Sequence, residues 1–209
     1  MKRNILLFSV IMFAAITACA KKVKVTIDGR TMPSQTTLYL IINEDTAHAV
    51  RVPIEDARYS ITVKVDQDAF IRLHDRIDFS ERCPFVLIPD SKHITVDWRT
   101  GTIEGSPMSQ KLKELTQQIQ GMGPGTFHID VFSDNPEDWK RAREQERSIR
   151  AEMEKRQQET IVTVMQENAD NIIPAWIFFC YGSMLQAPPT AFNGGTPPKW
   201  AGHPILKQK

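Results

Sequence analysis

Hydrophobic residues recur at every second position in the first half of the chain. Apolar and polar residues alternate between Val23 and Ile27 and again between Ile61 and Val65, a period typical of half-buried β-strands. Five further segments have strand-like composition: 38–42, 48–52, 70–74, 85–88 and 94–98. About seven short strands at this spacing predict an antiparallel β-sandwich or partly open barrel over residues 19–105.

Turn-forming residues separate these segments. Gly29 follows the first of them, Asn43-Glu44-Asp45 follows the second, and Asp56, Asp66 and Asp90 lie between later ones. Gly, Asn and Asp favour turns because they tolerate positive φ or bond their own backbone. We therefore expect the first strand to end at Gly29.

The period changes after Ser106, which is a good helix N-cap and is followed by Pro107. Apolar residues then recur at intervals of four and three, forming one stripe: Met108, Leu112, Leu115, Ile119 and Met122. This spacing predicts an amphipathic helix that stops near Gly121. We expect it to pack on the sheets of its own domain rather than to form a dimer interface.

A loop rich in Gly and Pro, residues 121–136, precedes a long charged helix over about 137–168. Three acid-before-base pairs at i, i+4 favour it: Glu137–Arg141, Glu146–Arg150 and Glu152–Arg156. Its first half has few apolar residues, whereas its second half has several. We expect a docked second half and a solvated first half; the alternative is that the first half binds a partner.

Asn171 is positioned to cap a third helix that ends near Leu185 and is apolar nearly all round, so we expect it to be buried or at an interface. Residues 106–185 are thus predicted as a helical extension packed on the β-domain. Residues 186–209 are rich in Pro and Gly and are predicted as a disordered tail. The predicted fold class is α+β.

The N-terminus has the pattern of a lipoprotein signal peptide over residues 1–18. Lys2 and Arg3 precede an apolar run that is too short to span a bilayer, and Ile16-Thr17-Ala18-Cys19 follows it. Cys19 is the predicted lipid attachment site. The alternative is an ordinary cleaved signal, or a buried helix, with a chance cysteine. Ala20, rather than Asp, favours the periplasmic side of the outer membrane in a Gram-negative cell.

The charge balance and the cysteines limit which binding partners and which covalent links we expect for this protein. The chain has 26 Lys and Arg against 25 Asp and Glu, which argues against a nucleic-acid partner and against polybasic adhesion to membranes. An oxidising periplasm would permit a disulfide between Cys83 and Cys180. We favour the alternative, that both are small buried hydrophobic residues.

Catalytic, cofactor and metal motifs are not found in the sequence. None of the histidines has zinc-finger or H-E-x-x-H spacing, and His74-Asp75 and His128-Ile129-Asp130 are weak metal candidates. We therefore predict no enzymatic activity, no cofactor and no metal. Thr46, in Asp45-Thr46-Ala47, is a candidate O-glycosylation site in a predicted turn.

The order of segments resembles a known module. A lipoprotein leader runs into a Val-x-Val-x-Ile-x-Gly strand, and the stretches ITVD (94–97), GTIEGSPMSQKL (101–112) and NADNIIPAW (168–176) follow. Over residues 22–185 this resembles the domain of unknown function 4369, which precedes thioredoxin-like domains in lipoproteins of anaerobic Gram-negative bacteria. The resemblance implies no catalytic residue in this module.

Family members typically continue into a thioredoxin-like domain, which needs on the order of 100 residues. The residues after Leu185 are too few for one, so we expect either a stand-alone module or a truncated chain. The leading hypothesis is a lipid-anchored envelope module that binds a partner protein or ligand. The alternative is an accessory or remnant of a thiol–disulfide oxidoreductase that works with a thioredoxin-like protein. A third hypothesis is glycan binding on the sandwich face with Tyr39 and Trp98 as stacking platforms, although core burial is favoured for both.

Overall fold

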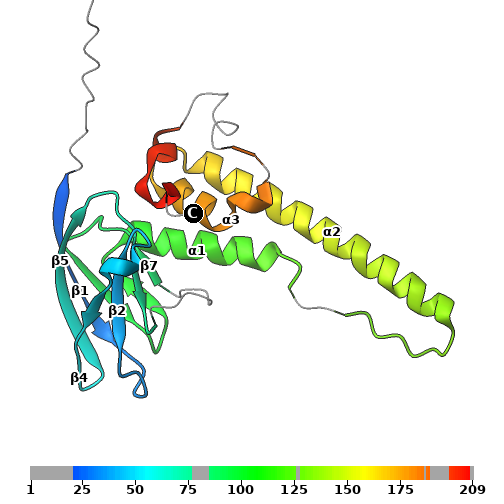
Figure 1. Ribbon diagram of the computed structural model, residues 1–209, viewed down its shortest axis with the longest axis horizontal. Helices are drawn as coiled ribbons and strands as arrows, with labels where there is room; N and C mark the ends of the chain where they lie inside the picture. Colours follow the sequence, from blue (N-terminus) through cyan, green and yellow to red (C-terminus); the bar gives the residue numbers. More distant parts are fainter. Residues whose placement is uncertain (1–20, 77–84, 126–127, 186, 189–197, 208–209) are drawn as a thin grey trace, which may run out of the picture.

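The computed structural model describes residues 21–76, 85–125, 128–185, 187–188 and 198–207. Within this part the fold is mixed α+β, with nine strands in two sheets and three α-helices (Figure 1). The helices lie together to one side of the sheets. None of the described helices is long and apolar enough to cross a membrane.

One sheet has five strands, in the order β4 (Ile54–Glu55), β5 (Arg58–Asp66), β1 (Lys22–Arg30), β8 (His93–Asp97) and β9 (Thr102–Glu104). Adjacent strands in this sheet run antiparallel, except that β1 and β8 run parallel to each other. The other sheet has four antiparallel strands, in the order β3 (Val50–Val52), β2 (Leu38–Ile42), β6 (Ile71–His74) and β7 (Phe85–Leu87).

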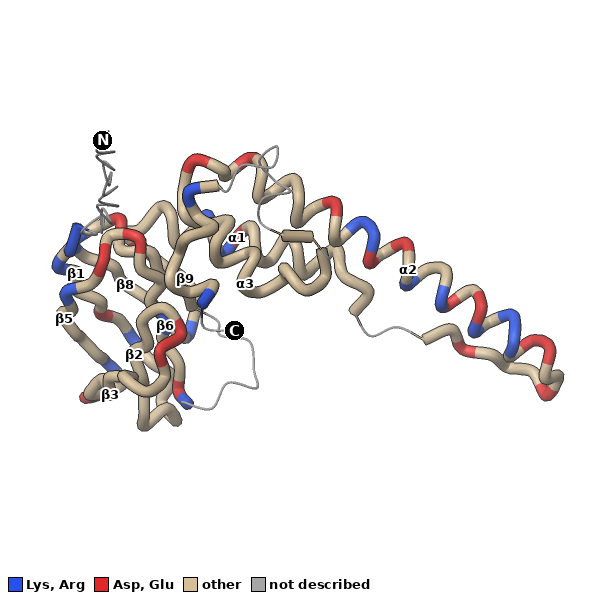
Figure 2. The backbone as a smooth tube through the Cα atoms, turned by 45° about the horizontal axis from the view of Figure 1, so that its top comes forward, with Lys and Arg blue, Asp and Glu red and all other residues tan. Residues whose placement is uncertain are grey.

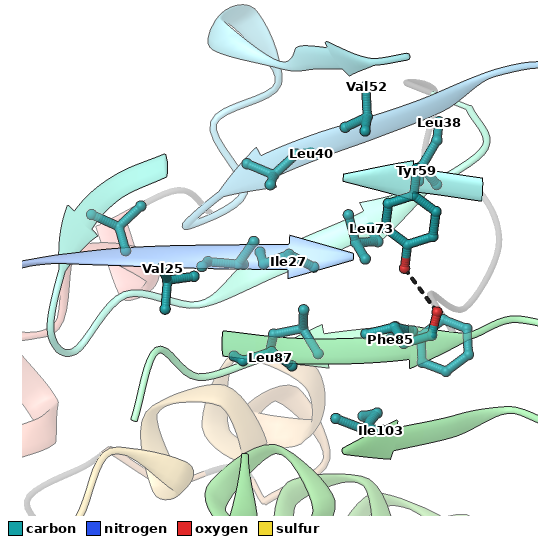
Figure 3. Close-up of a cluster of buried hydrophobic side chains, with 14 of the residues drawn as sticks. Val25, Ile27, Leu38, Leu40, Val52, Tyr59, Leu73, Phe85, Leu87 and Ile103 are labelled. Atoms are coloured by element: carbon teal, nitrogen blue, oxygen red, sulfur yellow. Dashed lines mark hydrogen bonds between the residues drawn. The ribbon is translucent and has the colours of Figure 1, made fainter. Parts of the chain in front are cut away.

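The inward faces of both sheets contribute to a single hydrophobic core (Figure 3). Val25 and Ile27 of β1 meet Leu38 and Leu40 of β2 in it, and all four are fully buried. The alternation seen in the sequence therefore separates a buried face from a polar one, and the arrangement is sandwich-like. The two strands beyond the predicted seven, β4 and β9, have only two and three residues, too few to show a period.

Helix α1 (Pro107–Met122) begins as predicted, because the Ser106 side chain accepts a hydrogen bond from the Ser109 amide. Ser109 in turn accepts from the Ile88 amide at 2.8 Å, which joins the helix to the sheet strand that ends at Leu87. Leu112 and Ile119 are buried in a second core. Helix α1 also contacts β7 and β9, so it lies against the sheets as predicted.

Helix α2 (Pro136–Glu167) is capped by Asn135, and only its second half is docked. Its buried residues all lie there: Gln157, Ile161, Val164 and Met165. Two of the three predicted ion pairs form, Glu146–Arg150 and Glu152–Arg156. The third prediction is wrong, because Arg141 pairs with Asp138, which is one residue closer in the sequence than Glu137.

Helix α3 (Ile173–Leu185) starts where Asn171 accepts a hydrogen bond from the Ile173 amide at 2.9 Å. It is buried in the second core, and two short 3-10 helices pack on it: η3 (Lys199–Gly202) and η4 (Pro204–Lys207). The prediction of a disordered tail is therefore wrong for residues 198–207.

The packed segment is held by both apolar and polar contacts. Trp200 and Ile205 are buried in the second core, and His203 Nε2 donates to the Asp68 carbonyl at 2.6 Å. The segment 198–207 therefore packs against α3 through two large apolar side chains, Trp200 and Ile205. Residues 186, 189–197 and 208–209 of the tail lie outside the described residues.

Candidate functional site

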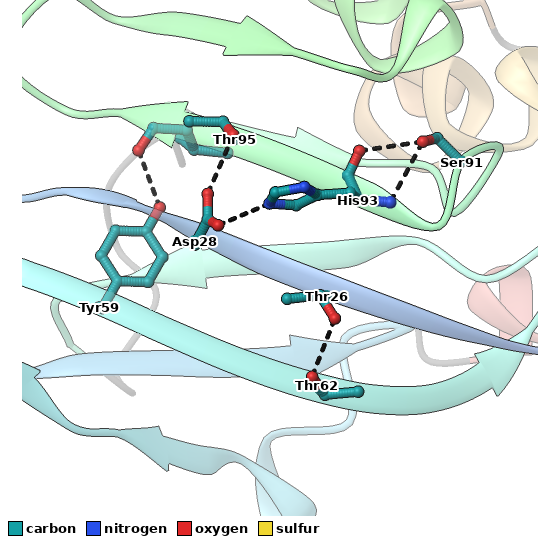
Figure 4. A network of polar contacts seen from close by, with 8 residues as sticks. Thr26, Asp28, Tyr59, Thr62, Ser91, His93 and Thr95 are labelled. Atoms are coloured by element: carbon teal, nitrogen blue, oxygen red, sulfur yellow. Dashed lines mark hydrogen bonds and ion pairs between the residues drawn. The ribbon is translucent and has the colours of Figure 1, made fainter.

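The outward face of the five-stranded sheet carries a polar network (Figure 4). Asp28 of β1 lies at its centre: its Oδ2 contacts His93 Nε2 at 2.6 Å, and its Oδ1 accepts from the Thr95 hydroxyl at 2.9 Å. Thr26 and Thr62 are bonded across β1 and β5 at 2.9 Å. These residues share one face because side chains alternate along each strand.

A carboxylate that contacts a histidine supplies two of the three groups of a nucleophile-activating arrangement, the base and the group that orients it; the third is the nucleophile. The nearby Ser91 hydroxyl bonds to the main-chain carbonyl and amide of His93 instead of its ring. In the described part of the chain, the geometry therefore orients a histidine without supplying a nucleophile to it.

An open hollow of about 1060 Å³ lies beside this network. It is lined by charged and hydroxyl side chains, with Arg30 and Arg58 directly opposite each other on β1 and β5. Carboxylates also line it: Asp28, Glu55, Asp56 and Asp97. The four carboxylates outnumber the two arginines, so the hollow suits hydrogen bonding to a polar ligand that is neutral or positively charged.

Tyr59 also reaches this region, from the buried side. Its hydroxyl donates to the Val96 carbonyl at 3.0 Å. Burial raises the pKa of Tyr59 well above its usual value; the nearby indole N–H of Trp98 opposes the rise, and the carboxylates of Asp28 and Asp97 add to it. Tyr59 therefore stays a neutral phenol that ties β5 to β8.

A second candidate site is the outer half of α2 with the loop that leads to it, residues 128–150, which we call the helical arm. Residues 128–135 lead to the start of α2, and the arm extends well beyond the rest of the molecule (Figures 1 and 2). A helix of 32 residues is about 48 Å long. The arm therefore offers a surface that the two cores do not cover.

The loop is fastened to the helix at the tip of the arm. The Trp139 indole donates to the Ser133 carbonyl at 2.7 Å, and the Ser133 hydroxyl donates to Asp138 at 2.6 Å. The Ser133 hydrogen bond lowers the pKa of the Asp138 carboxyl, with a further contribution from Arg141. Asp138 is therefore charged at neutral pH, and from the first turn of α2 its charge interacts favourably with the positive end of the helix dipole.

Two aromatic side chains are exposed at this tip. Phe132 is 98% exposed and Trp139 is 45% exposed. A fully exposed phenylalanine is unusual, because burial of its ring would be favourable by about 2 kcal/mol. A hollow of about 520 Å³ lies beside Trp139 and is lined by Pro136 and charged residues of the helix.

Several predicted site residues fall outside these two surfaces or outside the described residues. Cys19 and Cys83 belong to the latter group, so neither the lipid attachment nor a Cys83–Cys180 disulfide is tested. Cys180 is exposed on α3, so the prediction that it is buried is wrong. The run from Ile173 to Ile177 faces the core, and Cys180 lies beyond it on the solvent side.

Thr46 is exposed in a 3-10 turn, η1 (Thr46–His48), where His48 contacts Asp45 at 2.8 Å. Its position is accessible, as O-glycosylation would require. Trp98 is half-buried and packs edge-on against Phe85, with ring centroids 4.8 Å apart. That contact occupies Trp98 in the first core, which disfavours a stacking role.

The two weak metal candidates do not form clusters. His74 contacts Asp75 at 3.2 Å, whereas His128 lies 3.8 Å from Glu146. Among the described residues there is no group of three or more potential ligands.

No family model matches this chain, and no curated protein or solved structure matches it. The resemblance to the domain of unknown function 4369 therefore stays a prediction from sequence.

Proposed function

We propose that this protein is a lipid-anchored module of the cell envelope that binds a partner protein through its helical arm. The observation that carries the proposal is the exposed pair Phe132 and Trp139 at the tip of an arm that stands clear of both cores. Tryptophan is among the residues most enriched at the energetic centres of protein interfaces. The proposal assigns no reaction to the module.

The structure of the arm supports this role. Its loop is tied to the helix by Trp139–Ser133 and Ser133–Asp138, so the Trp139 indole is held in place before binding. Preorganisation of this kind lowers the entropic cost of association. Ion pairs along the helix, such as Glu146–Arg150 and Glu152–Arg156, stabilise a segment that buries little apolar surface.

The partner-binding proposal can be tested by photo-cross-linking in intact cells. With p-benzoylphenylalanine in place of Phe132, we expect a cross-linked adduct whose yield falls roughly thirtyfold with Trp139→Ala, because truncation of a hot-spot residue costs about 2 kcal/mol or more. The probe at Ser60, exposed on the outward face of β5, is the control. Absence of an adduct at position 132, or the same adduct at both positions, would contradict the proposal.

The lipid anchor is tested separately. Cys19→Ser removes the thiol that would carry the lipid, so the protein should move from the membrane pellet to the soluble fraction. Cys180→Ser, which changes an exposed cysteine on α3, should leave the protein in the pellet. Fractionation followed by immunodetection measures both, and a Cys19→Ser protein that stays in the pellet would refute the anchor.

A further inference from the structure

Three cations of the helical arm lie on one side of α2. Lys140, Arg143 and Arg147 are spaced at i, i+3 and i+7, which places them in line along a helix. All three line the hollow of about 520 Å³ beside Trp139. We call Lys140, Arg143 and Arg147 the cation row.

The cation row differs from the other cations of α2 in its neighbours. The others each contact a carboxylate: Arg141 with Asp138, Arg150 with Glu146, Lys155 with Glu159, and Arg156 with Glu152. In the part of the chain that the structure describes, no carboxylate lies within ion-pair distance, 4.0 Å, of the cation row. Its charges are therefore available to carboxylates from outside the molecule.

Two carboxylates at the hollow limit how such a ligand lies. Asp134 precedes the helix, and Glu144 lies between Arg143 and Arg147 in the sequence. The hollow keeps an excess of one positive charge, and Glu144 repels a ligand carboxylate placed beside it. A ligand therefore has to present its carboxylates at the spacing of the cation row.

We propose that the partner segment bound by the arm is acidic, with carboxylates one helical turn apart that face Lys140, Arg143 and Arg147, and with an apolar side chain against Trp139. This inference rests on the proposed function and specifies its partner. Arginine suits such a site, since its planar guanidinium binds carboxylates through two hydrogen bonds. Tryptophan and arginine are also the residues most enriched in interface hot spots.

An anionic membrane surface is the other class of partner for a row of cations. Helices that lie on membranes have an apolar face that enters the headgroup region. Acidic and basic residues are instead intermixed along the arm (Figure 2). The arm therefore fits an acidic protein segment better than it fits a bilayer.

The inference can be tested with two synthetic helical peptides. One carries Glu at positions i, i+3 and i+7 with a neighbouring Leu, and the other has Gln in place of each Glu. We expect the Glu peptide to bind and to quench tryptophan fluorescence, and the Gln peptide to bind about tenfold more weakly, the loss expected for three exposed ion pairs. Binding should weaken as salt is raised.

Two variants with the same loss of charge separate the cation row from net charge. Lys140→Gln/Arg143→Gln/Arg147→Gln should weaken Glu-peptide binding about tenfold, whereas Arg141→Gln/Lys155→Gln/Arg156→Gln should leave it nearly unchanged. Equal effects of the two variants, or no binding of the Glu peptide, would overturn the inference. Preferential binding to phosphatidylglycerol vesicles would overturn it in favour of a membrane.

The cross-linking experiment distinguishes failure of this inference from failure of the proposed function. If the adduct at position 132 survives in the Lys140→Gln/Arg143→Gln/Arg147→Gln variant, the arm binds a partner that does not use the cation row. If no adduct forms in the unsubstituted arm, the partner-binding function itself is wrong.

Discussion

Gly29→Ala is expected to destabilise the fold by about 4 kcal/mol or more, a large part of the roughly 5–15 kcal/mol that stabilises a typical domain. An ideal Cβ at position 29 would lie 1.9 Å from the Val96 carbonyl oxygen, and the φ of Gly29 is +154°, a region open only to glycine. Because Gly29 pairs with both Tyr59 and Val96, the backbone cannot move without opening the centre of the sheet.

Gly121→Ala is the matched control for this prediction. Gly121 lies within α1, and nothing is found within 4 Å of its added Cβ. Alanine is better than glycine inside a helix, so we expect stabilisation by about 0.5–1 kcal/mol. Urea unfolding followed by circular dichroism measures both variants. Equal midpoints for Gly29→Ala and the unsubstituted protein would show that the close approach at Gly29 is relieved cheaply.

Gly29 also shows where sequence patterns are insufficient. We expected a turn there, yet β1 continues to Arg30. The glycine is required by its neighbours in space: the Tyr59 hydroxyl is 3.1 Å from where its Cβ would be, and bonds to Val96 across it. By contrast Asn43, Glu44 and Asp56 have positive φ in turns, as predicted. A turn is a local property, whereas close approach of three strands is not.

The helices were more predictable because their signals are local. The Ser106 cap, the Asn171 cap and the half-docked charged helix all follow from spacing and residue type. The packed segment at 198–207 was missed because a composition rule averages over the whole tail. The segment is ordered because two of its side chains, Trp200 and Ile205, are buried where the segment packs against α3. That contact is made in the folded structure and is not visible in the composition of the tail.

The candidate site was predictable in part. The solvated first half of α2 follows from its few apolar residues, and the spacing of Lys140, Arg143 and Arg147 is visible in the sequence. The sequence does not predict which cations form ion pairs, because Arg141 pairs with Asp138 rather than with Glu137. The exposure of Phe132 has no sequence signal either, since it depends on which face of the extended loop meets the helix.

The second large effect is expected at a buried ion pair in the four-stranded sheet. Arg72 of β6 contacts Glu44, in the turn after β2, at 2.6 Å, and both side chains are nearly inaccessible to solvent. Removal of one partner leaves a buried charge without compensation, so Arg72→Met should cost about 3–5 kcal/mol at neutral pH. Urea unfolding at several pH values measures this loss.

The pH dependence of that loss identifies its cause. Burial raises the pKa of Glu44 above its ordinary value of 4.5, and Arg72 opposes the rise, so Arg72→Met raises the pKa further. A carboxyl whose folded-state pKa is raised contributes stability while protonated and loses that contribution as the pH rises through this pKa. The deficit of Arg72→Met should therefore be largest at neutral pH and shrink as the pH falls towards 4.5.

The double variant Arg72→Met/Glu44→Gln removes both charges and is the control for this prediction. The other contacts of Arg72 are lost in the single and the double variant alike, so the difference between the two isolates the charge on Glu44. We expect the double variant to be more stable than Arg72→Met at neutral pH and to lack the recovery at acidic pH. A deficit of Arg72→Met that is the same at every pH would show that lost packing, rather than a stranded carboxylate, causes the destabilisation.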